Sequence, residues 1–136
     1  MSAACFIGLQ YFTTVFTFAF AMGAARVLIV APRLGPTAAV LMEVPILVAA
    51  SWIVARRLVR NRSLTLSQRA AMGATAFTLT LLSEAALAAL MRGESVADWA
   101  AAIATPLGLV GLAGQIVFAA MPIFVGHGQT NTAPSV

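Results

Sequence analysis

The chain has 136 residues, of which 61% are hydrophobic and 9% are charged. Soluble domains carry about 25% charged residues, so this composition excludes an ordinary water-soluble protein and fits a single small domain in a lipid bilayer. The net charge of +4 comes from arginine alone, and most arginines lie at the edges of apolar runs. That placement is typical of membrane topology signals and argues against nucleic acid as a partner.

The first apolar run spans residues 6–31, more than the roughly 20 residues that a helix needs to cross a bilayer. It is too long for a signal peptide and no basic residue precedes it, so we interpret it as a retained transmembrane helix. Pro32, Gly35 and Pro36 follow and predict a tight turn, because proline cannot continue the hydrogen-bond ladder of a helix.

Three further runs have membrane length, and a polar tail at 127–136 is predicted to be disordered. Ser67 is the predicted cap of the third helix. The predicted fold class is therefore all-α: an integral membrane four-helix transmembrane bundle made of two helical hairpins. The predicted spans are residues 6–31, 37–59, 68–91 and 99–124.

The segment 56–69, between the second and third runs, contains five arginines and no acidic residue. Cytoplasmic loops of membrane proteins are enriched in basic residues, which places this segment on the cytoplasmic side. With four spans, both termini are then cytoplasmic as well. We expect a multi-pass protein of the inner (plasma) membrane, with the two short turns on the outer side.

Three ionisable residues interrupt the apolar runs: Arg26, Glu43 and Glu84. Each costs about 2.5–3.5 kcal/mol to insert into hydrocarbon, so each needs a partner or a function. The rise of a helix places all three, together with Thr105 of the fourth run, roughly 8–12 Å below the outer boundary. The sequence thus predicts one polar layer in the outer half of the membrane, to which every helix contributes.

Two prolines, Pro45 and Pro106, fall at the same predicted level. A proline inside a helix frees a backbone carbonyl, which membranes tolerate where protein or a water-filled cavity satisfies it. We therefore hypothesise an outward-facing vestibule. Arg26 and Glu43 are equally distant from the turn, so they either neutralise each other and fasten the hairpin or contribute to an ion site.

Glu84 has no obvious cation of its own, because two acids and one base cannot all pair. It either shares the Arg26 guanidinium with Glu43 or remains a group that can take up and release a proton, as proton-coupled transport requires. A plain helix–helix hydrogen bond is the structural alternative. Thr80 lies one turn earlier on the same helix face and could bond Glu84.

The fourth run contains a face of small residues whose key positions are Ala104, Gly108 and Gly111. Small residues let helices approach closely in lipid, so this packing seam predicts a buried helix interface, within the chain or with another subunit. Gln115 lies on the same face and is expected to supply an interhelical hydrogen bond rather than a ligand contact.

The sequence lacks the residues that several kinds of functional site require. The one histidine, His127, lies in the tail, so haem ligation by two histidines is excluded and a zinc or copper site is not expected. Cys5 is the one cysteine, which excludes a disulfide framework. No nucleophile–histidine–acid set is present. Nothing indicates a substrate for Glu43 and Glu84 as an acid–base pair, so we expect neither an enzyme nor a cofactor.

Two functions remain open. In the first, the chain is a proton- or cation-linked transporter or channel-like protein that acts as a homo-oligomer, with Glu84 and Glu43 binding the ion and Arg26 gating the site. In the second, it is a non-catalytic accessory or assembly subunit of a larger membrane complex.

Overall fold

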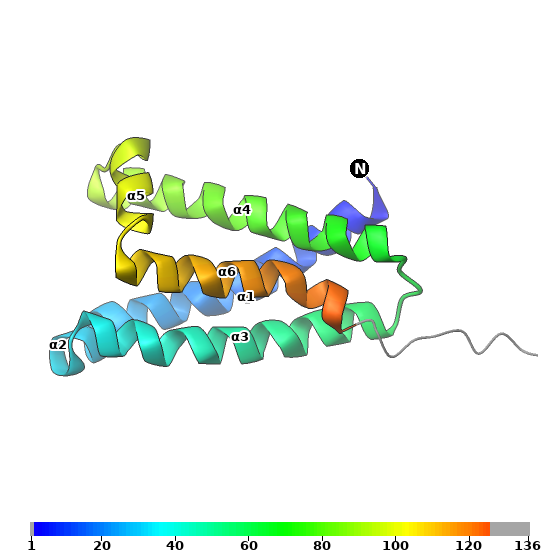
Figure 1. Ribbon diagram of the computed structural model, residues 1–136, viewed down its shortest axis with the longest axis horizontal. Helices are drawn as coiled ribbons and strands as arrows, with labels where there is room; N and C mark the ends of the chain where they lie inside the picture. The colour runs from blue at the N-terminus through cyan, green and yellow to red at the C-terminus, as the bar shows by residue number, and fades with distance from the viewer. Residues whose placement is uncertain (1, 126–136) are drawn as a thin grey trace, which may run out of the picture.

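The computed structural model describes residues 2–125, and the regular structure within them is entirely helical, as the sequence predicts (Figure 1). The predicted disordered tail at 127–136, with His127, lies outside the described residues. The elements in chain order are α1 (Ala3–Ala25), the π-helical segment η1 (Arg26–Val30), α2 (Ala31–Leu34), α3 (Pro36–Arg60), α4 (Leu66–Arg92), α5 (Val96–Ile103) and α6 (Pro106–Phe124).

Four helices are long and apolar enough to cross a membrane, and they indicate a membrane protein. Each is an unbroken helical stretch in which charged residues are rare. They are Ala3–Leu34, Pro36–Arg60, Leu66–Arg92 and Pro106–Phe124.

The first hairpin turns later than predicted, because the helix continues through Pro32 to Leu34. Pro32 has no N–H, and in a regular α-helix its ring would crowd the carbonyl four residues earlier. The turn just before Pro32 is a π-helical turn, which is wider than an α-helical one. In it, the N–H of Ala31 donates to the carbonyl of Arg26, five residues earlier. The reversal occurs at Gly35, whose φ of 84° is a conformation that glycine adopts without strain.

The fourth predicted span, 99–124, is divided in the structure. Ser95 caps a short helix, α5, and Thr105 caps a second one, α6, which begins at Pro106. Proline suits this first helical position because its missing N–H would have no helical partner there. Figure 1 shows α5 lying across the end of the long helices rather than along them. The membrane-length part of this run is therefore α6 alone.

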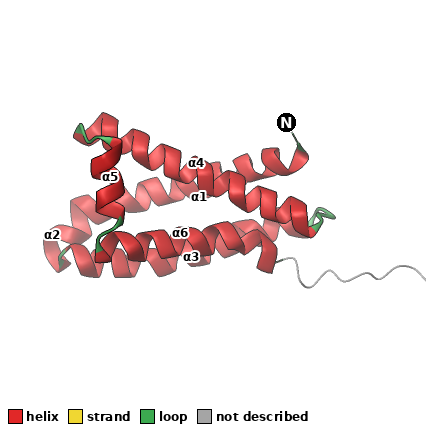
Figure 2. Cartoon of the chain, turned by 45° about the horizontal axis from the view of Figure 1, so that its top comes forward, coloured by secondary structure: helices red, strands yellow, loops and turns green. Residues whose placement is uncertain are grey.

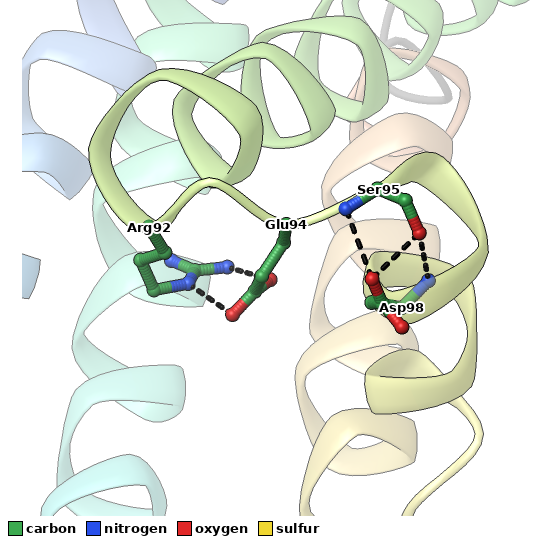
Figure 3. Close-up of polar contacts among 4 residues, drawn as sticks. All are labelled: Arg92, Glu94, Ser95 and Asp98. Carbon is green, nitrogen blue, oxygen red and sulfur yellow. Dashed lines mark hydrogen bonds and ion pairs between the residues drawn. The ribbon is translucent and has the colours of Figure 1, made fainter.

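The link between α4 and α5 is fixed by polar contacts of its own (Figure 3). Arg92 donates two hydrogen bonds to the carboxylate of Glu94, of 2.6 and 2.8 Å. Ser95 and Asp98 form a reciprocal capping box, in which each side chain bonds the backbone N–H of the other. The hydroxyl of Ser95 also donates to the carboxylate of Asp98, at 2.6 Å, and this bond, together with the one from the backbone N–H of Ser95, lowers the pKa of Asp98. The hydrogen bond from Arg92 lowers the pKa of Glu94.

At the opposite end, a short loop joins α3 to α4. Thr65 caps α4 and forms a capping box with Gln68. The cap therefore lies slightly earlier in the chain than the predicted cap, Ser67. The arginine-rich segment thus lies mostly on the last turns of α3 and in this loop.

The four long helices form a ring, in which α1 and α6 each pack against both α3 and α4 (Figure 2). The most buried cluster lies toward the arginine-rich end of this ring, where Tyr11 and Phe118 stack with ring centroids 4.5 Å apart. Tyr11 is fully buried there. The other members of the cluster are Ile7, Val15, Ala55, Val59, Met72, Ala76 and Met121.

Pro122 explains why a tyrosine occupies this core. As an N–H-less residue inside α6, it leaves the carbonyl of Phe118, four residues earlier, without its helical donor. The hydroxyl of Tyr11 donates to that carbonyl at 3.0 Å. A second contact, at 3.4 Å, joins it to the carbonyl of Ser51 on α3. One side chain of α1 therefore ties together three helices.

Small residues mediate close helix contacts at Gly108 of the predicted seam and at Gly73 outside it. A side chain at Gly73 of α4 would overlap the backbone carbonyl of Ala119 on α6. A side chain at Gly108 of α6 would overlap the backbone carbonyls of Ala102 and Ile103 at the end of α5. Apart from the adjoining backbone of its own helix, no atom of the described chain lies within 4 Å of a side-chain carbon built at Gly111. Ala104 is exposed at the end of α5, so it is not part of one face with α6.

Candidate functional site

The carboxyl group of Glu84 lies against α6. The side-chain amide of Gln115 donates a hydrogen bond of 2.6 Å to its Oε1 atom, between two partly buried residues. From the helix rise, Glu84 lies about 12 Å from the end of α4 at Arg92, and Gln115 about 14 Å from the start of α6 at Pro106. The two residues therefore meet within the apolar length of both helices.

A second polar contact joins α1 and α3. Nε of Arg26 lies 2.6 Å from Oε2 of Glu43, and the two side chains are 35% and 12% exposed. Arg26 begins the π-helical turn, while Oε1 of Glu43 lies toward Gly23, at an ordinary contact distance of 3.8 Å from a side-chain carbon built at that glycine. The pairing deduced from the equal distances to the turn is thus present in the structure.

One apolar contact connects the two pairs. Gly114 of α6 packs against Val44 of α3, with 3.0 Å between a methyl group of Val44 and a side-chain carbon built at the glycine. Because Val44 follows Glu43 and Gly114 precedes Gln115, the ion pair and the Glu84 contact lie at one level of the ring. They occupy opposite edges of it, α1–α3 and α4–α6.

We call this level, made of Arg26, Glu43, Glu84 and Gln115, the polar layer. It differs from the predicted layer in its contribution from the fourth run. Thr105 caps α6, where its hydroxyl accepts from the N–H of Gly108 and donates to the carbonyl of Ala102. Gln115 is the residue of the fourth run that lies in the layer instead of Thr105, because the break after α5 changes the depth of every later residue in the run.

Thr80 also behaves differently from its prediction. Its buried hydroxyl donates to the carbonyl of Ala76 on its own helix, at 2.9 Å, rather than to Glu84. Such bonds to the preceding turn satisfy a hydroxyl inside a helix. Glu84 is therefore held from the neighbouring helix α6 and not by its own.

The charges in the layer are distributed unequally. Among residues 2–125 there are two ion pairs, Arg26 with Glu43 and Arg92 with Glu94. Within that range Arg26 is thus engaged by Glu43 alone, and sharing of one guanidinium by both acids is not observed. Glu84 faces a neutral amide instead of a cation. It is the member of the layer whose charge has no opposite charge beside it.

The amide of Gln115 is only half satisfied. Its Nε2 bonds Glu84, while its Oε1 is buried and has no hydrogen-bond partner in the described structure. An ionised carboxylate has only acceptors and cannot supply that donor. Protonation turns one oxygen of Glu84 into an O–H donor beside an amide whose oxygen lacks one. The pair is therefore suited to a carboxyl group that takes up and releases a proton.

The described residues offer little for other chemistries. No group of three histidine, cysteine, aspartate or glutamate residues within 2–125 lies close enough to hold a metal ion. Two features were not predicted from the sequence. The first is the hydrogen bond from Tyr11 to the carbonyl of Phe118, for which the proline four residues after Phe118 was the available signal. The second is a groove near Arg62, described below.

Comparison of the chain with protein-family models, curated proteins and solved structures finds no match.

Proposed function

We propose that the chain is a four-helix transmembrane bundle that moves protons, or another small cation, across the inner (plasma) membrane, with Glu84 as the ion-binding group. Four apolar helices of membrane length support the bundle. The arginines of 56–69 support a cytoplasmic position for that segment and for both ends of this chain. The polar layer then lies in the outer half of the membrane.

The observation that carries the proposal is the Glu84–Gln115 contact. A carboxyl group within the apolar length of a helix, with no cation beside it, is costly to keep charged, and such groups mark proton and ion pathways. Gln115 holds it with one donor and offers an unpaired acceptor. We propose that the ionised carboxylate accepts from the Nε2 of this amide and that the protonated form donates to its Oε1.

The Arg26–Glu43 pair has a supporting part in this mechanism. It is neutral as a couple, but its guanidinium lies at the level of Glu84 on the opposite edge of the ring. Because Glu43 balances that charge, the pair adds no net charge to the layer, and Glu84 is left as the group that attracts a cation. The pair also fastens the first hairpin, which keeps the level of the layer constant.

A single copy of so small a bundle can enclose only a short path for an ion. Two open grooves of the described structure are lined by residues of the arginine-rich half, and neither includes a residue of the polar layer. We therefore propose a homo-oligomer, with the path to Glu84 formed between copies. The mass of the protein extracted from its native membrane into nanodiscs tests this point.

The function is tested by flux into liposomes that contain the purified protein and a pH-sensitive dye. The wild type is expected to dissipate an imposed pH gradient, and Glu84→Gln, which cannot ionise, to abolish that flux while keeping the fold. Glu94→Gln, outside the apolar spans, is the matched control and retains it. Equal flux from wild type and Glu84→Gln contradicts the proposal. Sodium and potassium gradients identify the ion.

One observation favours the alternative of a non-catalytic accessory subunit. The space in front of Gly111 on α6 is open in this chain, which suits close approach of another helix. Under this alternative, Glu84→Gln is silent and Gly111→Leu breaks assembly. Copurification of the chain with a larger complex would favour the accessory role, and a clean homo-oligomer would favour transport.

A further inference from the structure

An open groove of about 520 Å³ lies between α1 and α3 at the arginine-rich end of the molecule. One wall comes from α1, and the other comes from the end of α3 and the loop after it. Its lining residues are Leu9, Gln10, Thr13, Thr14, Leu58 and Arg62. Four of these six side chains are polar, which is unusual for a chain whose residues are 61% hydrophobic.

The cation of the groove is held in position. Nη1 of Arg62 donates a hydrogen bond of 3.0 Å to the carbonyl of Leu58, one turn earlier, which restricts the position of the guanidinium. A guanidinium has five N–H donors, and this contact uses one of them. Its remaining donors form the fork that binds phosphate oxygens in a bidentate way.

The opposite wall supplies an unsatisfied amide. Oε1 of Gln10 is buried and has no hydrogen-bond partner among the described residues. The hydroxyl of Thr14 donates to the carbonyl of Gln10, so it also presents acceptor lone pairs to the groove. A bound group that carries both phosphate oxygens and hydroxyl donors would satisfy both walls.

The surroundings select an anion at a membrane surface. The segment 56–69 has five arginines and no acid, so the local field is positive. Trp52, on the adjoining face of α3 beside Arg56 and Arg57, is a residue type that favours the headgroup level. Leu9 and Leu58 add an apolar strip in the same groove.

We propose that this groove binds the headgroup of an anionic phospholipid of the phosphatidylglycerol type. Arg62 pairs with the phosphate, Gln10 accepts from a headgroup hydroxyl, and Leu9 and Leu58 contact the first methylenes of an acyl chain. The site is independent of the polar layer and of any transport function. It makes a specific lipid, rather than the bilayer in general, a ligand of this protein.

The test uses the full chain in detergent micelles that contain phosphatidylglycerol and phosphatidylcholine, with bound lipids counted by native mass spectrometry. The wild type is expected to retain phosphatidylglycerol selectively. Arg62→Gln is expected to weaken that binding about tenfold, the usual loss for one charge-assisted contact. Arg57→Gln removes the same charge outside the groove and is expected to change it less than twofold.

Gln10→Leu provides a second variant that leaves every charge in place. It is expected to reduce the preference for phosphatidylglycerol over phosphatidic acid, which has the phosphate but no glycerol hydroxyls. Equal losses for Arg62→Gln and Arg57→Gln would overturn the site, because they would show diffuse attraction only. Binding of inorganic phosphate that depends on Arg62, without any such dependence for phosphatidylglycerol, would overturn the lipid as its source.

Discussion

The amide nitrogen of Gln115 on α6 lies 2.6 Å from a carboxyl oxygen of Glu84 on α4, and the amide oxygen of the same glutamine is buried without a partner. This relationship distinguishes Glu84 from Glu43, whose carboxylate is 2.6 Å from the guanidinium of Arg26. One acid of the polar layer is thus neutralised by a fixed charge. The other faces a group that can serve either protonation state.

The Arg26–Glu43 pair is expected to stabilise the first hairpin. Arg26→Met leaves Glu43 without its cation in an apolar region, so we expect a loss of about 3 kcal/mol in the free energy of unfolding. Adding Glu43→Gln should recover much of that loss. Reversible unfolding in bicelles measures the cycle, with Arg33→Met, exposed in α2, as the control. Additive losses in the double variant would contradict the pairing.

Two glycines should respond oppositely to the same added methyl group. Gly73→Ala forces α4 away from the carbonyl of Ala119, and we expect it to destabilise the fold by about 1–3 kcal/mol. Gly111→Ala meets no atom of the described chain within 4 Å apart from the adjoining backbone of its own helix, and should be neutral or stabilising by up to about 1 kcal/mol. Thermal unfolding of the two variants compares them. A neutral Gly73→Ala would contradict the close α4–α6 contact.

The hydroxyl of Tyr11 should stabilise the fold, because Pro122 leaves a backbone carbonyl without its helical donor. Tyr11→Phe leaves the carbonyl of Phe118 unpaired in the core, at an expected cost of about 1–3 kcal/mol. Pro122→Ala restores a backbone N–H to that carbonyl, so Tyr11→Phe should cost less in that background. A double-mutant cycle on unfolding free energies measures the difference. The same cost in both backgrounds would refute the explanation.

The capping box at the start of α5 predicts that the stability of this helix depends on pH. Hydrogen bonds from Ser95 hold the pKa of Asp98 below its ordinary value of about 3.9. Their stabilising effect is therefore full above that ordinary value and is lost as the pH falls through the lower folded pKa. Ser95→Ala should raise the pKa of Asp98 in an NMR titration, while that of Glu94, which Arg92 lowers, stays unchanged. An unmoved Asp98 would contradict this origin of the shift.

The sequence predicted local relationships better than distant ones. Arg26 and Glu43 are close along the chain, and one turn fixes their register, so equal distance from it was enough to pair them. Glu84 and Gln115 are separated by a loop, a short helix and a cap. Thr105, the cap that separates α6 from α5, is also visible in the sequence, but the apolar run 99–124 continues on both sides of it.

The groove at Arg62 could not be predicted because its walls come from segments far apart in the chain. The composition of segment 56–69 indicates a topology signal but does not indicate a binding site. The role of Gln10 depends on how α1 packs against α3, and on the direction in which its amide is turned. Neither follows from helical periodicity.

The central claim is that Glu84 takes up and releases a proton beside Gln115. Infrared difference spectroscopy of the protein in lipid, recorded between acidic and alkaline pH, observes the carbonyl band of a protonated carboxyl group directly. We predict a band that disappears in Glu84→Gln, shifts in Gln115→Leu and is unchanged in Glu94→Gln. A spectrum of Glu84→Gln identical to that of the wild type would contradict the claim.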